Sequence, residues 1–213
     1  MAQATMNSGC AKGDKYKMQA DKKKNSFGWF GLKKEQNLED AAELYKNAAI
    51  QYKISKLWDL AGLCYALAAE CNMGSDNDID AKSNWRESGK CYRHSDYKKA
   101  IESYKNAIQM NLDNDRFNQA AKLQEEIGDM LAEDEHYDEA VLSYEKSAEY
   151  YDADNDTVNK NKRLLKVAKM SAKVGQYKKG YNIFKDIANN SADNQLLRWK
   201  VKEYCFNAML LVI

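Results

Sequence analysis

The chain has 213 residues, with 33 Lys and Arg against 32 Asp and Glu, so its formal net charge is +1. This balance excludes a protein that is basic throughout and coats nucleic acid, and no nucleic-acid partner is expected. Hydrophobic residues make up 44% of the chain, enough for a packed core. Proline is absent and glycine occurs only 10 times. Folds of strands and turns usually need more turn-forming residues, so the composition favours an all-α protein.

The first predicted domain, residues 1–36, is basic. Its first 34 residues hold eight lysines against two aspartates, and nothing in it resembles a secretion signal. Four large apolar side chains lie between glycines and lysines here, namely Phe27, Trp29, Phe30 and Leu32. Such a loop can enter the headgroup region of a membrane while its lysines meet anionic lipid. The alternative is that the aromatic rings fold back onto the first helix of the repeat.

A repeated spacing covers the second predicted domain, residues 37–213. Apolar or small side chains recur at i, i+3, i+7 and i+10, as in Leu38, Ala41, Tyr45 and Ala48, which follows one face of an α-helix. The expected helices cover 38–48, 58–68, 78–88, 97–107, 117–127, 137–147, 158–168, 177–187 and 197–207. We predict about nine antiparallel helices in a right-handed, tetratricopeptide-like solenoid. The Tyr, Trp and Ala positions are expected to be core, and Asp or Asn in the breaks to cap the next helix.

No catalytic, metal or cofactor site stands out in the sequence. There is no GxSxG, HExxH, P-loop or GxGxxG motif, so no catalytic residue is named and no enzyme is expected. The five cysteines fit no metal-binding spacing, and with two histidines we expect no metal and no cofactor. Cys64, Cys71 and Cys91 lie among apolar helical positions and are expected to be small buried hydrophobes, with reduced thiols in a cytosolic protein.

Basic residues recur on alternate predicted helices. Lys162 and Lys166 form an i, i+4 pair, as do Arg198 and Lys202. Because alternate helices of a solenoid line one surface, these residues could form a basic stripe that suits an acidic partner. A merely solvated face of the solenoid is the other interpretation, because the intervening helices also carry lysines.

Together these features resemble the soluble NSF attachment protein family. The glycine-aromatic segment 27–32 stands where family members have a membrane-attachment loop, after a short first helix. The stretches that carry the rest of the resemblance are 41–49, 116–122, 144–151, 161–168 and 196–204, of which 161–168 is the most specific. The resemblance covers the chain from about residue 20 to its end.

The resemblance implies an adaptor for vesicle-mediated and intracellular protein transport, including transport between endoplasmic reticulum and Golgi, and not an enzyme. Its partners would be SNARE four-helix bundles, with syntaxin-like and other SNAREs, and the hexameric ATPase NSF, on the cytosolic face of membranes. The residues implied to face the SNAREs are Lys56, Arg116, Lys122, Lys162, Lys166, Arg198 and Lys202. Those implied to contact the membrane are Phe27, Trp29, Phe30 and Leu32.

Family members continue past the point where this chain stops, with a C-terminal bundle that contacts NSF. We therefore expect this chain to bind SNARE bundles weakly and not to stimulate NSF. The apolar stretch 208–213 predicts self-association. The competing hypothesis is a general tetratricopeptide-like scaffold or co-chaperone that captures acidic peptides. Segment 27–32 separates the two, because a peptide-binding co-chaperone needs no membrane anchor.

Overall fold

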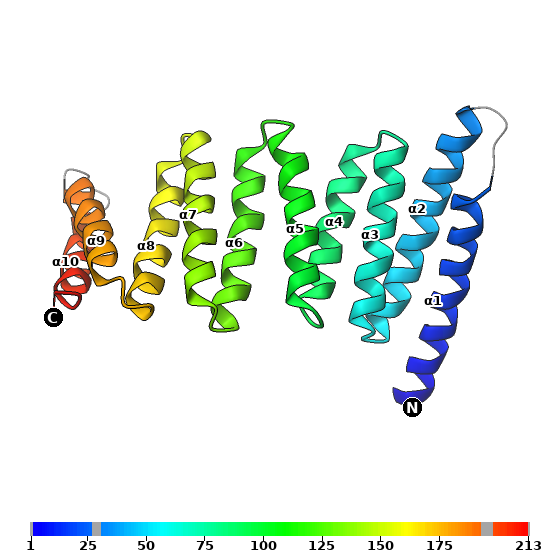
Figure 1. Cartoon of the computed structure of the whole chain (residues 1–213), viewed down its shortest axis with the longest axis horizontal. Helices are drawn as coiled ribbons and strands as arrows, with labels where there is room; N and C mark the ends of the chain where they lie inside the picture. The colour runs from blue at the N-terminus through cyan, green and yellow to red at the C-terminus, as the bar shows by residue number, and fades with distance from the viewer. Residues whose placement is uncertain (1, 27–30, 193–197, 213) are drawn as a thin grey trace. The chain divides into compact units, whose positions relative to one another are not determined.

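The computed structural model describes residues 2–26, 31–192 and 198–212, and within these ranges every regular element is a helix (Figure 1). The elements are α1 (Ala2–Lys24), α2 (Gly31–Ile54), α3 (Trp58–Gly74), α4 (Asp78–Tyr92), α5 (Tyr97–Leu112), α6 (Phe117–Glu133), α7 (Tyr137–Ala153), α8 (Thr157–Lys173), α9 (Tyr177–Ala192), a 3-10 turn η1 (Arg198–Lys200) and α10 (Val201–Met209). The helices α2–α10 correspond to the predicted repeat. The helix α1 is the one that only the family resemblance implied.

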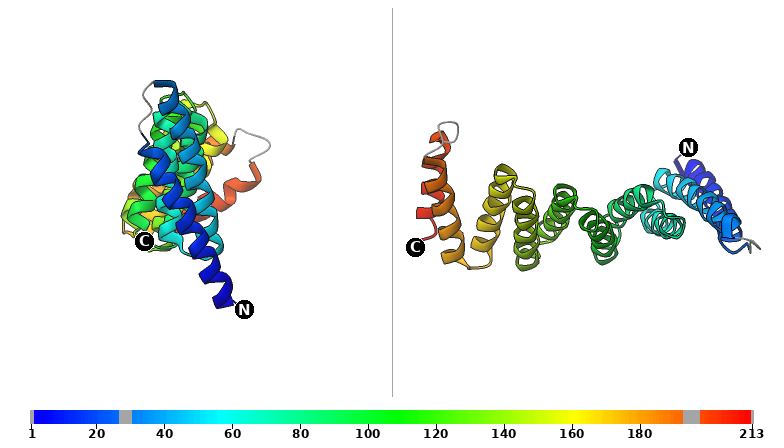
Figure 2. Two further views of the ribbon diagram at one scale, coloured as in Figure 1. Left: turned by 90° about the vertical axis from the view of Figure 1, so that its right-hand side faces the viewer. Right: turned by 90° about the horizontal axis from the view of Figure 1, so that it is seen from above.

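The helices form two compact units, Met1–Asn114 and Asp115–Ile213, called unit 1 and unit 2 below. Unit 1 holds α1 to α5 and unit 2 holds α6 to α10. Within each unit every helix packs against the next, and consecutive helices run in opposite directions (Figures 1 and 2). The predicted all-α repeat of antiparallel helices is therefore confirmed. The domain boundary predicted after residue 36 falls inside α2. The division of the chain into two domains at that point stays a prediction.

Small and aromatic side chains fill the core of each unit as the spacing predicts. Ala41 and Ala48 are fully buried, and Tyr45 and Tyr144 are 2% and 3% exposed. Small side chains beside large rings let neighbouring helices approach closely. Tyr177, however, is 54% exposed, so its prediction as core is wrong. It begins α9, and a side chain in the first turn of a helix lies at the edge of the packed layer.

Several turns between helices share one backbone feature. Residues with a left-handed backbone recur in them, at Lys56, Asp76, Asp115, Glu135, Asn155 and Gly175. Two of the expected caps are present, because Asn77 and Asp156 accept hydrogen bonds from the backbone N–H groups of Asp80 and Asn159, whereas the breaks before α6 and α7 supply no side-chain cap. The three cysteines expected to be buried, Cys64, Cys71 and Cys91, are at most 1% exposed. Among the described residues, no helix is both long and apolar enough to cross a membrane.

Candidate partner-binding surface

The predicted basic residues of α6 and α8 lie on one surface of unit 2. Lys122 on α6 and Lys162 on α8 are exposed, while Lys166 on α8 is half-buried. Lys166 contacts Glu125 and Asp129 of α6 directly. Lys122 precedes Glu125 by three residues and Lys162 precedes Lys166 by four, so each shares a helix face with the residue that makes the contact. The exposed faces of α6 and α8 are therefore neighbours. Arg116, at the start of α6, is also exposed.

A charge network ties α6 to α8 beneath this surface. The Nζ atom of Lys166 lies 2.7 Å from Glu125 Oε1 and 2.6 Å from Asp129 Oδ1. Arg163 lies 2.5 Å from the second oxygen of Glu125, and these two side chains are only 13% and 17% exposed. Burial of Lys166 lowers the pKa of its ammonium group, but hydrogen bonds to Asp129 and Glu125 outweigh this and raise that pKa above its ordinary value. Lys166 therefore stays charged.

Two tyrosines of α7 contact the side chains of this charge network. Tyr144 donates a hydrogen bond from its hydroxyl to Asp129 Oδ1 at 2.6 Å, and its ring centroid lies 5.0 Å from Lys166 Nζ. The guanidinium of Arg163 stands 5.1 Å from the ring centroid of Tyr151. Lys166 thus has partners on two other helices of its own chain, so a partner protein would meet a charge that is already balanced. Lys162 is exposed, and its Nζ atom lies 3.5 Å from Asn159 Oδ1 on its own helix, so its charge is more available to a partner.

The other residues predicted to face SNAREs lie elsewhere. Lys56 belongs to unit 1, where it is exposed in the turn between α2 and α3 with a φ of 57°. Arg198 lies in η1, where its Nε atom is 3.4 Å from the carbonyl oxygen of Ala192. Lys202 is exposed on α10. Their role toward a partner stays a prediction.

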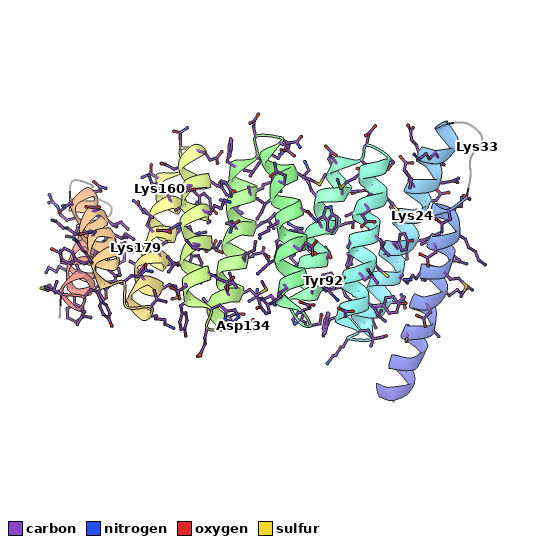
Figure 3. All side chains as sticks on the ribbon, in the orientation of Figure 1. Lys24, Lys33, Tyr92, Asp134, Lys160 and Lys179 are labelled. Carbon is purple, nitrogen blue, oxygen red and sulfur yellow. The ribbon has the colours of Figure 1, made fainter. Side chains whose placement is uncertain are left out.

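The predicted membrane contacts fall on Phe27, Trp29 and Phe30, which lie outside the described residues, as does the side chain of Leu32. The described residues on either side of them are polar or charged. Lys24 ends α1, and Lys33 is exposed in the first turn of α2 (Figure 3).

Sequence reasoning did not find Glu125, Asp129 or Arg163. A signal was present, because Glu125 and Asp129 are four residues apart on one predicted helix and Arg163 and Lys166 three apart on another. What the sequence lacked was the pairing between those two helices. In the described part of the chain, no group of three or more His, Cys, Asp or Glu side chains is arranged to hold a metal ion.

The comparisons with known proteins decide the family. The family model described as "Soluble NSF attachment protein, SNAP" matches residues 11–213. The chain belongs to this family. The match includes most of α1, segment 27–32 and all the basic residues described above. The resemblance inferred from the sequence is confirmed.

Curated relatives agree with this assignment. The chain is 34% identical over 197 residues to the alpha-soluble NSF attachment protein of Vitis vinifera, covering 92% of this chain and 67% of that protein. It is 35% identical to the beta-soluble NSF attachment protein of Bos taurus, covering 81% of this chain and 58% of that protein. A probable vesicular-fusion protein sec17 homolog of Schizosaccharomyces pombe is 31% identical, with 92% and 69% covered. The chain thus spans about three fifths to two thirds of the length of these relatives.

One solved structure is similar in fold alone. The crystal structure of BtubC (BKLC) from P. vanneervenii gives a TM-score of 0.50 at 9% sequence identity, covering 99% of this chain and 83% of that one. At this identity the likeness carries no function.

Proposed function

We propose that this chain is a non-enzymatic adaptor in vesicle fusion, which binds assembled SNARE four-helix bundles and recruits an NSF-type ATPase. The observation that carries the proposal is the family match over residues 11–213. Relatives named as vesicular-fusion proteins support the same process.

Lys122 and Lys162 are the residues that we expect to contribute most to SNARE binding. They are exposed on adjacent helix faces, where each offers a positive charge to acidic side chains of a bundle. The network of Arg163 and Lys166 with Glu125 fixes α6 and α8 to each other. Because the spacing between Lys122 and Lys162 is set before the partner arrives, little conformational freedom is lost on binding.

Membrane attachment is the second part of the proposal. Segment 27–32 would insert its apolar side chains among lipid headgroups, and the nearby lysines would meet anionic lipid, each contributing about 1 kcal/mol near the surface. The protein would then act peripherally, on the cytosolic face of membranes. Replacing Phe27, Trp29 and Phe30 by Ser should weaken binding to vesicles and spare binding to a SNARE bundle. Unchanged vesicle binding would refute the anchor.

The central experiment measures binding to a preassembled SNARE bundle across a salt series, with unassembled SNAREs as the reference. The variant Lys122→Glu/Lys162→Glu should bind about tenfold more weakly or worse, and the binding of the unmodified chain should weaken with salt. The matched control is Lys146→Glu/Lys185→Glu, which changes the charge of unit 2 equally at exposed lysines of α7 and α9. Equal weakening by both variants, or no preference for the assembled bundle, would refute the proposed surface.

A further inference from the structure

The first helix of the chain is held in place by little apolar packing. Among the described side chains of α1, Gly9, Gly13 and Ala20 are buried, and Cys10 and Tyr16 are partly buried against the core formed by α2 and α3. The side chain of Met18, also on α1, is 59% exposed. Burial of so little apolar surface contributes correspondingly little to docking. An exposed polar helix is also marginal by itself, because most helical stability in proteins comes from tertiary packing. Polar contacts therefore add to this limited packing in holding α1 on α2.

Two hydrogen bonds between phenols and carboxylates join α1 to α2. The Tyr52 hydroxyl donates to Asp14 Oδ1 at 2.6 Å, and the Tyr45 hydroxyl donates to Asp21 Oδ1 at 2.5 Å. Both the aspartates and the tyrosines are seven residues apart, which places each pair of residues on one face of its helix. Burial raises the pKa of both phenols, as do the hydrogen bonds to the carboxylates. Each phenol therefore remains a protonated donor to a charged acceptor, which is the stronger kind of hydrogen bond.

The backbone of α1 also approaches α2 closely. A Cβ atom on Gly13 would lie 2.7 Å from the ring of Tyr52, closer than real Cβ atoms come to a neighbour, and one on Gly9 would meet Ser55. At the lysine-rich end of α1, Lys23 pairs with Asp40 of α2 at 2.6 Å and Lys24 with Glu70 of α3 at 3.3 Å. The docked position of α1 is thus specified along its length by polar and close contacts.

Docking of α1 holds the described residues on either side of positions 27–30 together. The Ser26 carbonyl accepts a hydrogen bond from Asn37 of α2 at 3.2 Å, and the Ser26 hydroxyl donates to the Lys23 carbonyl at 2.8 Å. The helix α2 begins at Gly31. The end of α1 and the start of α2 are therefore held together, and their lysines stand at the same end of the helix pair, where Figure 3 labels Lys24 and Lys33.

We propose that Tyr45 and Tyr52, through Asp21 and Asp14, are positioning residues for membrane attachment. They clamp α1 onto α2 so that the exposed Lys22 at the end of α1 and Lys33 and Lys34 at the start of α2 act as one basic cluster toward an anionic lipid surface. This inference rests on the proposed membrane attachment. Charges that are already held at one end of a helix pair bind a surface together, whereas lysines on a detached helix would have to be gathered at an entropic cost.

The test uses the full chain carrying Tyr45→Phe/Tyr52→Phe, which removes both hydroxyls and leaves the net charge unchanged. The matched control is Tyr144→Phe, which removes the same kind of bond, to Asp129, in unit 2. Binding is measured to phosphatidylcholine vesicles with and without phosphatidylserine. We expect the double variant to bind the anionic vesicles about threefold to tenfold more weakly, with a shallower salt dependence. Amide exchange in α1 should quicken about tenfold, while exchange in α6–α8 and binding to a SNARE bundle stay unchanged.

An engineered disulfide distinguishes loss of α1 docking from general damage to the fold as the cause of weaker vesicle binding. A Cβ atom at position 9 would lie 3.6 Å from that of Ser55, within the range of about 3.5–4.5 Å that disulfides require. Adding Gly9→Cys and Ser55→Cys to the double variant, with Cys10→Ser to prevent mispairing, tethers α1 without the phenols. Oxidation should restore the affinity for anionic vesicles and reduction should remove it again. A variant whose only defect is a disturbed α2 core would not be rescued in this way.

Two results would overturn the inference alone. One is unchanged exchange in α1 of the double variant, since the phenols then do not dock the helix. The other is faster exchange in α1 with vesicle affinity equal to that of the unmodified chain. If the unmodified chain itself fails to bind anionic vesicles, the proposed membrane attachment falls, and this inference falls with it.

Discussion

The α1–α2 pair of unit 1 and the α6–α7–α8 group of unit 2 use the same bond in different surroundings. In both, a buried tyrosine donates its hydroxyl to an aspartate at 2.5–2.6 Å. In unit 2 the acceptor, Asp129, also pairs with Lys166, which in turn reaches Glu125. In unit 1 the aspartates belong to a first helix that packs mainly on α2. The same bond is therefore one of several connections in unit 2 and a main connection in unit 1.

This difference separates a rigid surface from a detachable element. A charge network spanning three helices resists local opening, because breaking one contact leaves the others in place. A terminal helix that packs mainly on one neighbour, through limited apolar contact and half-exposed polar contacts, opens at less than the global free energy of unfolding. We therefore expect unit 2 to present its basic residues in fixed positions, and α1 to be the part of unit 1 that opens most easily.

The largest effect is expected in the reactivity of the cysteines. Burial raises the pKa of Cys64 to about 12 and that of Cys91 to about 11, whereas Cys205 on α10 is exposed. A maleimide should label Cys205 at least about a thousandfold faster than the buried thiols of unit 1, which react only when the unit opens. Mass spectrometry of a labelling time course measures this. All five thiols should label alike in denaturant, and comparable native rates for Cys64 and Cys205 would contradict the packing described here.

Arg163→Met should cause the largest loss of stability. It removes one partner of the pair Arg163–Glu125, in which both side chains are mostly buried. Because Lys166 still compensates Glu125, we expect a loss of about 2 kcal/mol, below the range for a buried charge left without a partner. The matched variant in unit 1 is Lys23→Met, whose pair with Asp40 is 44% and 38% exposed. It should cost less than about 1 kcal/mol. Urea unfolding compares the two, and equal losses would contradict the contrast between the units.

Two glycines that lie against tyrosine rings test how far each region can adjust. A Cβ atom on Gly128 of α6 would lie 2.8 Å from the ring of Tyr144, and one on Gly13 of α1 would lie 2.7 Å from the ring of Tyr52. Gly128→Ala should cost about 1–2 kcal/mol, because α7 is packed between α6 and α8 and cannot move away. Gly13→Ala should change global stability by less than about 0.5 kcal/mol, because the better helix propensity of Ala offsets a shift of α1. A cost at Gly13 equal to that at Gly128 would show that α1 is as firmly held as α6.

The two regions also differ in how much of their structure could be predicted from the sequence. The core of α2–α10 could be predicted because it repeats a local spacing, as in Tyr104 and Ala107 on α5. The docking of α1 could not be predicted, because the bonds Tyr45–Asp21 and Tyr52–Asp14 join residues 24 and 38 apart along the chain. No periodic apolar pattern in the sequence indicates these pairs.

In the candidate site, the basic residue types were predictable and their internal partners were not. The sequence placed Lys162 and Lys166 on one helix face, but only the packing of α8 beside α6 shows that Lys166 is balanced by Glu125 and Asp129. The prediction that Tyr177 is a core residue was wrong for a related reason. Its spacing matches the core pattern, but its place at the start of α9 leaves it exposed. A pattern along one helix does not report what the next helix covers.

The smallest expected effect is an acid-dependent loosening of α1. A hydrogen bond from Lys23, and a second one from Gln36, hold the pKa of the Asp40 carboxyl below its ordinary value of 3.8. A carboxylate with a lowered pKa in the folded state stabilises that state above its ordinary pKa, and this contribution is lost as the pH falls through the lowered value. Below about pH 4, docking of α1 should therefore weaken before the core of unit 1 opens.

Amide exchange between about pH 5 and pH 3, corrected for its intrinsic pH dependence, measures this loosening. Exchange in α1 should quicken relative to α3, which lies in the interior of the same unit. In the variant Asp40→Asn, α1 should exchange faster already at the higher pH and respond less to acid, because the charge that acid removes is then already absent. An acid response of the same size in both proteins would assign the loosening to other carboxylates and leave the Lys23–Asp40 pair without a part in docking α1.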